Sequence, residues 1–180
     1  MPSGNPEPQA LAERLEQAFE AHHARMFRAA YRVTGASADA EDVLQTVFLR
    51  LAQAERWPEA EGEALGHYLH RAAINAALDL LRGRARRKVI PLEAAGRAPS
   101  PEPDAAARAD DADLRQRLRL GLAELSPRAA EIVTLKYLEG FGNQEIADLV
   151  GASESAVGVS LHRSRERLRR LLATNPGEDA

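Results

Sequence analysis

A proline-rich segment near the middle of the chain limits the folds that the chain can adopt. Prolines stand at positions 91, 99, 101 and 103, among small and acidic residues that cannot build a packed core. The segment predicts an extended, flexible linker over residues 89–111. The 180-residue chain is therefore expected to form two small units, one on each side of the linker.

On both sides of the linker, apolar residues recur every three or four positions, which is the spacing of one helix face. Alanine and leucine supply most of these residues, and both rank high in helix propensity. The predicted helices begin near Leu11, Ser37, Leu65, Leu114, Ser126, Gln144 and Ser153. At three of these starts, Ser37, Ser126 and Ser153 are the expected N-caps. We predict an all-α fold of two small helical domains joined by a flexible linker.

The expected domain boundaries follow from the linker and from the helical pattern. They are a disordered N-terminus at 1–10, an N-terminal domain at 11–88, the linker at 89–111, a C-terminal domain at 112–173 and a disordered tail at 174–180.

Composition excludes several classes of protein. The chain has no cysteine, which excludes disulfides and thiolate metal sites. It has no apolar run of about 18 residues and no signal-peptide pattern at its start, so we expect a soluble, cytoplasmic protein without membrane insertion. His67 and His70 share a predicted helix face, but the five histidines form no ligand set, and no nucleophile-base pair stands out. Neither catalysis nor a cofactor is expected.

The net charge of −3 conceals two basic segments. Residues 71–88 hold six basic side chains against one acid, and residues 162–170 hold five arginines against one glutamate. The intervening segment, 93–113, is acidic. Local fields rather than the total charge attract a polyanion, so this distribution predicts nucleic-acid binding.

Residues 144–171 match a helix-turn-helix layout, in which a tight turn joins two helices and the second is basic. Gly151 permits the turn, Ala147 lets the helices approach, and Val157 and Leu161 fill the angle between them. The alternative is an ordinary surface helix with solvated arginines. In a helix-turn-helix, base edges and phosphates would meet the outward side chains, which are Val159, His162, Arg163, Glu166 and Arg170.

Three segments together resemble the bacterial RNA polymerase sigma factors of the extracytoplasmic-function (ECF) group. They are DAEDVLQTVFLRL at 39–51, YLHRAAINAALDLLRGRARR at 68–87 and LSPRAAEIVTLKYLEGFGNQEIADLVGASESAVGVSLHRSRERLRRLL at 125–172. The resemblance covers both units in the family's order. It implies a transcription initiation factor that binds core RNA polymerase and promoter DNA, and that an anti-sigma factor holds inactive.

The resemblance implies that the helix at 39–51 binds a coiled coil on the largest core subunit. The residues assigned to this contact are Asp42, Gln45, Leu49 and Arg50. The acids at the start of this helix, Asp39 among them, can instead complement the helix dipole.

The segment at 68–87 resembles the element that captures the melted minus-ten strand. Such capture needs a basic track for phosphates and flat or amide side chains for unstacked bases. The resemblance assigns this role to Tyr68, Arg71, Asn75 and Arg82, with Asn75 as the expected base contact. Core packing is the alternative for Tyr68. Asp79 is expected to pair with Arg82 or Arg71.

The last helix resembles the element that reads the minus-thirty-five duplex. The residues assigned to it are Ser155, Val159, His162, Arg163 and Arg165. Gly158 stands where the family commonly has a basic residue. Glycine costs roughly 1 kcal/mol of helix stability relative to alanine, and it either weakens DNA binding or lets the backbone approach the groove.

Two other classes remain open. A stand-alone helix-turn-helix regulator with a helical sensing or dimerisation half would bind duplex DNA without polymerase. A helical adaptor for proteins alone would leave both basic segments unexplained. In the linker, the acids Asp104, Asp110 and Asp111 either mimic nucleic acid near the polymerase active site or belong to a solvated tether.

Overall fold

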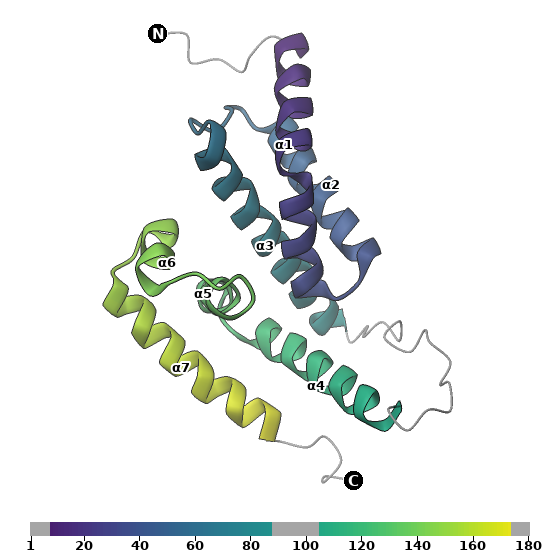
Figure 1. The fold of residues 1–180 in the computed structure, drawn as a ribbon, viewed down its shortest axis with the longest axis vertical. Helices are drawn as coiled ribbons and strands as arrows, with labels where there is room; N and C mark the ends of the chain where they lie inside the picture. The colour runs from purple at the N-terminus through teal and green to yellow at the C-terminus, as the bar shows by residue number, and fades with distance from the viewer. Residues whose placement is uncertain (1–7, 88–104, 174–180) are drawn as a thin grey trace.

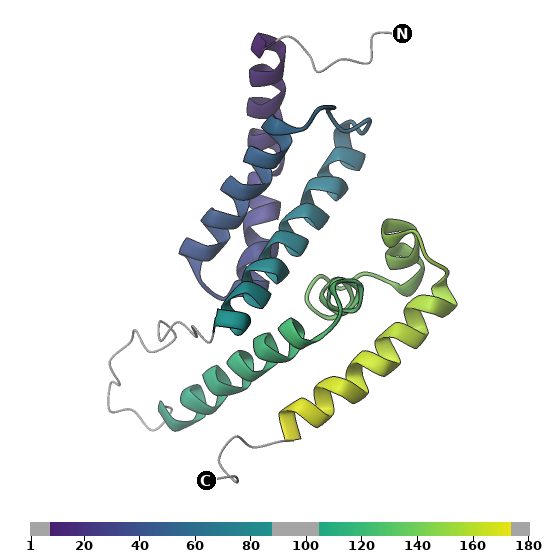
Figure 2. The same ribbon diagram turned by 180° about the vertical axis from the view of Figure 1, so that it is seen from behind.

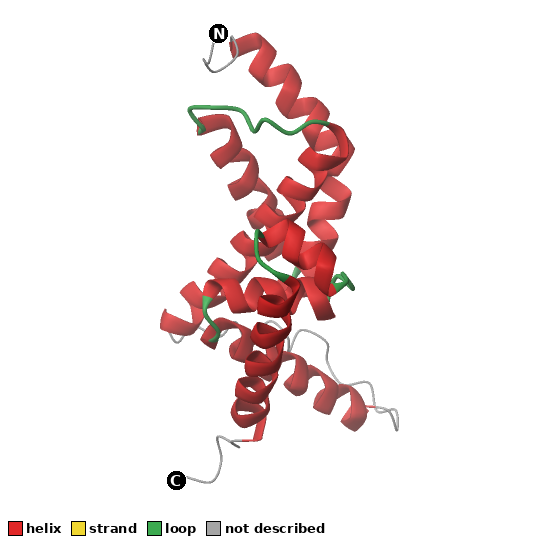
Figure 3. Ribbon diagram, turned by 90° about the vertical axis from the view of Figure 1, so that its left-hand side faces the viewer, coloured by secondary structure: helices red, strands yellow, loops and turns green. Residues whose placement is uncertain are grey.

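The computed structural model describes residues 8–87 and 105–173. Across these two ranges the chain forms seven helices and no strand, as Figures 1 and 3 show. The all-α prediction is confirmed. None of the helices within these ranges has both the length and the apolar character of a membrane span.

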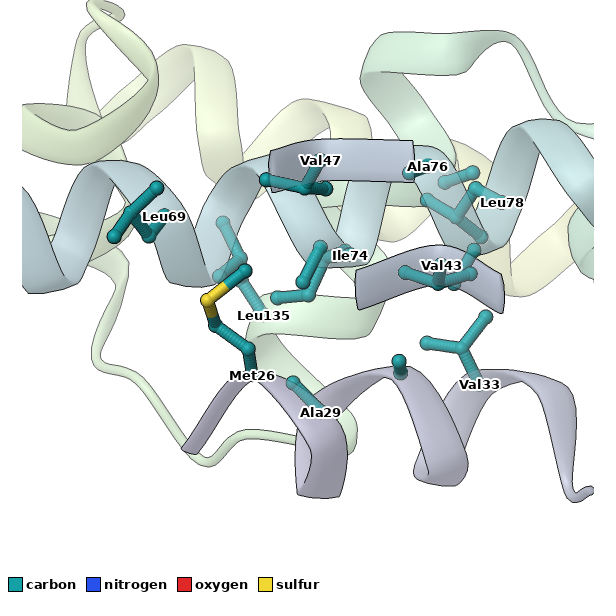
Figure 4. Packing of buried hydrophobic residues seen from close by; sticks show 14 of the residues in the cluster. Met26, Ala29, Val33, Val43, Val47, Leu69, Ile74, Ala76, Leu78 and Leu135 are labelled. Atoms are coloured by element: carbon teal, nitrogen blue, oxygen red, sulfur yellow. The ribbon is translucent and has the colours of Figure 1, made fainter. Parts of the chain in front are cut away.

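Three helices make the N-terminal unit: α1 (Pro8–Thr34), α2 (Ser37–Gln53) and α3 (Gly62–Arg87). α1 ends before Gly35, whose φ of 77° lies in the left-handed region that glycine enters readily. The apolar faces of the three helices meet in a core where Met26, Val43 and Ile74 are almost fully buried (Figure 4).

The start of α2 differs from the prediction. Ser37 is the first helical residue, and Ala36 occupies the N-cap without a side-chain hydrogen bond. Asp39, in the first turn, is buried and forms an ion pair with Arg84 of α3. The structure therefore shows Asp39 linking two helices, a role that was not predicted from the sequence.

Four helices make the C-terminal unit: α4 (Ala105–Glu124), α5 (Pro127–Tyr137), α6 (Asn143–Val150) and α7 (Glu154–Ala173). The Ser126 hydroxyl accepts a hydrogen bond from the Ala129 N–H at the start of α5, so this predicted N-cap is confirmed. Ser153 caps α7 in the same way, through the Ala156 N–H. Both caps satisfy backbone donors that the first helical turn leaves open.

The described helices extend beyond the predicted domain boundaries. α4 begins at Ala105, inside the predicted linker, because the alanines at its start favour a helix and acids that follow pair with arginines one turn later. Asp110 and Asp111 therefore lie on a helix. α1 likewise includes residues 8–10 of the predicted N-terminal tail. Asp104, the rest of the linker and the predicted C-terminal tail lie outside the described residues.

The two units pack against each other. α5, seen end-on in Figures 1 and 2, lies between α3 and α7, and α4 also contacts α3. The buried apolar residues of both units form one continuous cluster, in which Leu135 of α5 is buried together with Met26 and Leu69 (Figure 4). The C-terminal unit therefore packs against α3, the basic helix of the N-terminal unit.

Candidate nucleic-acid interface

The turn between α6 and α7 has the geometry that a helix-turn-helix requires. Gly151 has φ of 63° and ψ of 53°, a left-handed conformation that ends α6 and turns the chain. On either side of the turn, Ile146 and Ala147 of α6 are buried, as are Val157 and Leu161 of α7. The predicted packing of the motif is confirmed.

The outer face of α7 carries the predicted duplex-binding side chains. Arg163 is exposed, and it borders an open groove between α7 and the start of α5. Ser126 and Val159 also line this groove. The other residues assigned to the duplex are exposed on the same helix: Ser155, Val159, His162 and Arg165.

Gly158 is free of packing constraints. A Cβ at this position would meet no atom of the described residues within 4 Å. No contact within the described protein therefore requires glycine in this helix.

The residues assigned to the melted strand lie along α3, and the structure brings some of them together. Tyr68 is 50% exposed, which argues against core packing. Arg71 and Asn75 stand one turn apart and share a contact with the C-terminal unit. Arg82 lies further along the helix and pairs with Asp79 at 2.9 Å, as predicted.

Glu131 of α5 is the shared partner of Arg71 and Asn75. Its Oε1 accepts hydrogen bonds from Nε and Nη2 of Arg71 at 2.9 and 2.8 Å, and from Nδ2 of Asn75 at 3.1 Å. Glu131 is 4% exposed, and its other oxygen lies 3.7 Å from the Arg128 guanidinium. Hydrogen bonds from a guanidinium to a buried carboxylate are among the strong ones in proteins.

A second carboxylate joins the two units at His70, the residue before Arg71. Glu139, two residues after the end of α5, accepts hydrogen bonds from His70 at 2.9 Å and from Arg32 of α1 at 3.0 Å. Burial by itself raises the pKa of Glu139, but the hydrogen bonds and charges of His70 and Arg32 outweigh it, so this pKa lies below its ordinary value. The carboxylate form thus holds the units together.

An apolar groove opens on the other side of the N-terminal unit, between α1 and α2. Two of its large side chains are well exposed, Phe19 at 46% and Leu49 at 53%. Phe48 and Gln45 line it as well. Asp42 and Arg50, also assigned to polymerase, are exposed on α2. The four α2 residues are thus well separated in sequence and on the fold from the Glu131 contact.

Sequence reasoning missed Glu131 and Glu139. One signal was present for Glu131, which precedes the apolar residue Leu135 by four positions and so shares its helix face. A carboxylate on a buried face needs a partner, but nothing in the sequence identifies Arg71 of α3 as that partner. Glu139 lies near the glycines that end α5 and carries no comparable signal.

Two histidines of α3 contact carboxylates. His70 bonds Glu139, and His67 lies 3.7 Å from Glu63 on the same helix. Within the described ranges, no three histidine, aspartate or glutamate side chains gather as a metal site would require.

Two protein families match this chain. Residues 18–87 match Sigma-70 region 2, and residues 115–168 match Sigma-70, region 4. The first match covers most of α1 to α3, and the second runs from α4 into α7.

Curated relatives and a solved structure agree with these matches. The chain is 31% identical over 174 residues to the ECF RNA polymerase sigma factor SigE of Mycolicibacterium smegmatis, covering 96% of this chain and 66% of the relative. It is 32% identical over 161 residues to the ECF RNA polymerase sigma factor SigM of Mycobacterium tuberculosis, covering 88% and 76%. Its fold is similar to that of CnrH in complex with the cytosolic domain of CnrY, with a TM-score of 0.50, 24% identity and coverage of 91% and 92%.

In this chain, region 2 precedes region 4, and these regions contain the basic α3 and the helix-turn-helix. This combination defines a transcription initiation factor that recognises promoters. The chain belongs to the ECF group of RNA polymerase sigma factors, the alternative sigma factors that direct the polymerase to specific promoters.

Proposed function

We propose that three surfaces of the protein have separate roles in transcription initiation. The groove between α1 and α2 binds core RNA polymerase, α3 captures the melted minus-ten strand, and α7 reads the minus-thirty-five duplex. The two domains that perform these roles are residues 11–88 and 112–173. The protein acts in the cytoplasm and catalyses no reaction itself, because the polymerase supplies the chemistry of RNA synthesis.

The observation that carries the polymerase assignment is the exposed apolar groove. Leu49 at 53% and Phe19 at 46% exposure present apolar surface to solvent, which is typical of a protein-binding site. Gln45 lines the groove, and Asp42 stands exposed one helical turn before it. A partner helix could cover the apolar side chains and pair with the polar ones.

The minus-ten assignment is supported by the types of side chain that lie along α3. Tyr68 offers a half-exposed ring for base stacking. Arg71 and Asn75 offer a guanidinium and an amide on the same face, and Arg82 extends the basic track. These are the groups that an unstacked, anionic strand requires.

The minus-thirty-five assignment is supported by Arg163 and Arg165 on the exposed face of α7. Val159 and Ser155 lie one and two turns nearer the helix start, where such helices contact base edges. The absence of a side chain at Gly158 leaves this surface with fewer charges than the family commonly has.

An inhibitory protein partner is part of the proposal. CnrH, which shares the fold, was solved with the cytosolic domain of CnrY. We infer that this chain too binds an inhibitory protein, an anti-sigma factor, as its membership of the ECF group implies.

The test of the polymerase surface is co-elution of the purified chain with core RNA polymerase in gel filtration. Asp42→Ala combined with Gln45→Ala should abolish the complex. Gln53→Ala combined with Glu55→Ala is the matched control, since it removes one amide and one acid at exposed positions near the end of α2.

The complex should survive in the control variant. If the parent chain fails to co-elute although it is folded and free of partners, the assignment of the groove between α1 and α2 to core polymerase is wrong. If both double variants co-elute, polymerase binds a different surface.

A further inference from the structure

Glu131 occupies donors of α3 that a captured strand would use. One carboxylate oxygen accepts from Nε and Nη2 of Arg71 and from Nδ2 of Asn75, all within 3.1 Å. The residue is 4% exposed, so solvent has little access to this contact.

The contact has the chemistry of strand binding. A carboxylate oxygen, like a phosphate oxygen, is an anionic acceptor, and a guanidinium binds either one through paired N–H groups. The Asn75 N–H that donates to Glu131 is not available to a base edge at the same time. A strand phosphate at Arg71 would also be repelled by the Glu131 charge.

Other contacts hold α5 in this position. Glu139, two residues after the end of α5, bonds His70 and Arg32, and Leu135 is fully buried in the shared core. On α4, Nε of Arg119 donates to the carbonyl of Val33 at 3.3 Å. The described arrangement is therefore held by polar and apolar contacts from α4, from α5 and from Glu139, which follows α5.

We infer that this arrangement is a closed, autoinhibited state, in which the Glu131 carboxylate substitutes for the nucleic-acid acceptor on α3. A strand can bind α3 only after α5 has moved away from it. The inference rests on the proposed role of α3 in strand capture.

Closure has a measurable consequence for affinity. When only the open form binds, the apparent dissociation constant equals the intrinsic one divided by the open fraction. Any change that weakens closure without altering Arg71 or Asn75 should therefore tighten strand binding.

The probe is a short fluorescein-labelled single-stranded DNA of randomised sequence, and the readout is fluorescence anisotropy at fixed salt. Glu131→Gln keeps the size of the side chain and removes its charge. Glu20→Gln makes the same charge change at an exposed position of α1 and is the matched control. Glu131→Gln with Arg71→Gln tests whether any gain arises on α3.

We expect Glu131→Gln to bind the strand about tenfold more tightly than the parent, because a hydrogen-bonded charge is lost from the closed state only. Glu20→Gln should match the parent, and adding Arg71→Gln should remove the gain. Glu139→Gln, which leaves Glu131 in place, should produce a smaller gain in the same direction. Circular dichroism establishes that each variant is folded.

Two results would overturn the inference. One leaves the proposed role of α3 intact, and the other contradicts that role as well. If the parent binds the strand through Arg71 and neither glutamate variant binds more tightly, closure does not inhibit, while the proposed role of α3 stands. If no variant binds in a manner that depends on Arg71, the role of α3 fails along with the inference.

Discussion

Arg119 of α4 lies against Gly35, the residue that follows α1. Its guanidinium occupies the space where a Cβ at position 35 would stand, and its Nε donates to the Val33 carbonyl. Gly35 also has φ of 77°, a conformation that residues with a Cβ rarely adopt. The backbone conformation thus favours glycine here, and an added Cβ would also displace the Arg119 guanidinium.

Gly35→Ala should destabilise the protein by more than backbone strain alone. Strain in the left-handed region costs about 1–2 kcal/mol, and displacement of Arg119 adds to this. Gly140→Ala is the matched control, since Gly140 has φ of 80° and open space around its Cβ position. Urea unfolding should show a larger loss for Gly35→Ala, and equal losses would mean that the Arg119 contact contributes nothing.

Gly158→Ala should stabilise the protein. Alanine is favoured over glycine inside a helix by about 1 kcal/mol, and the added Cβ meets no described atom within 4 Å. Thermal unfolding measures this gain. Gly158→Lys should also strengthen duplex binding and steepen its salt dependence by about one phosphate contact. Weaker duplex binding by both variants would indicate that the glycine serves close approach to DNA.

Asp39 and Asp42 should respond differently to the same substitution. Asp39→Asn weakens the buried ion pair with Arg84 and should cost about 2–4 kcal/mol of unfolding free energy. Asp42→Asn, at an exposed position, should leave stability within about 0.5 kcal/mol and weaken core binding instead. The measurements are urea unfolding and polymerase co-elution on each variant. Equal stability of the two variants would contradict the structural role of Asp39.

Acid should weaken the folded state through Glu139. The pKa of this carboxyl lies below its ordinary value of 4.5, so the unfolded chain binds the proton at a higher pH than the folded chain does. The resulting stabilisation is complete above pH 4.5 and is lost as the pH falls through the lowered pKa. The difference in unfolding free energy between the parent and Glu139→Gln should shrink over that range. A difference that is constant with pH would contradict this account.

Local features of the fold could be predicted because neighbouring residues determine them. Gly151 is needed for a left-handed turn between two short helices, and Ser126 and Ser153 cap the helices that follow them. The caps depend on residues within three positions, and the turn depends on a single backbone conformation. Ser37 failed as a cap because the helix begins one residue earlier, at a boundary that the pattern of apolar residues does not determine.

The contacts between the units could not be predicted in the same way. Arg71 and Glu131 are 60 residues apart, and their pairing depends on how two separate helical units dock. The sequence shows α3 as a basic helix and α5 as an apolar one with a carboxylate on its face. Only the fold shows that the carboxylate meets the donors assigned to the strand.

Transcription in vitro tests the central claim most directly. The reaction contains the purified chain, core RNA polymerase from the organism that encodes it and genomic DNA, with transcript starts mapped at nucleotide resolution. The account predicts start sites that depend on the chain and share minus-ten and minus-thirty-five elements. Asn75→Ala should lose these starts while still co-eluting with core polymerase. Absence of chain-dependent starts from a stable complex of the chain with core polymerase would contradict the account.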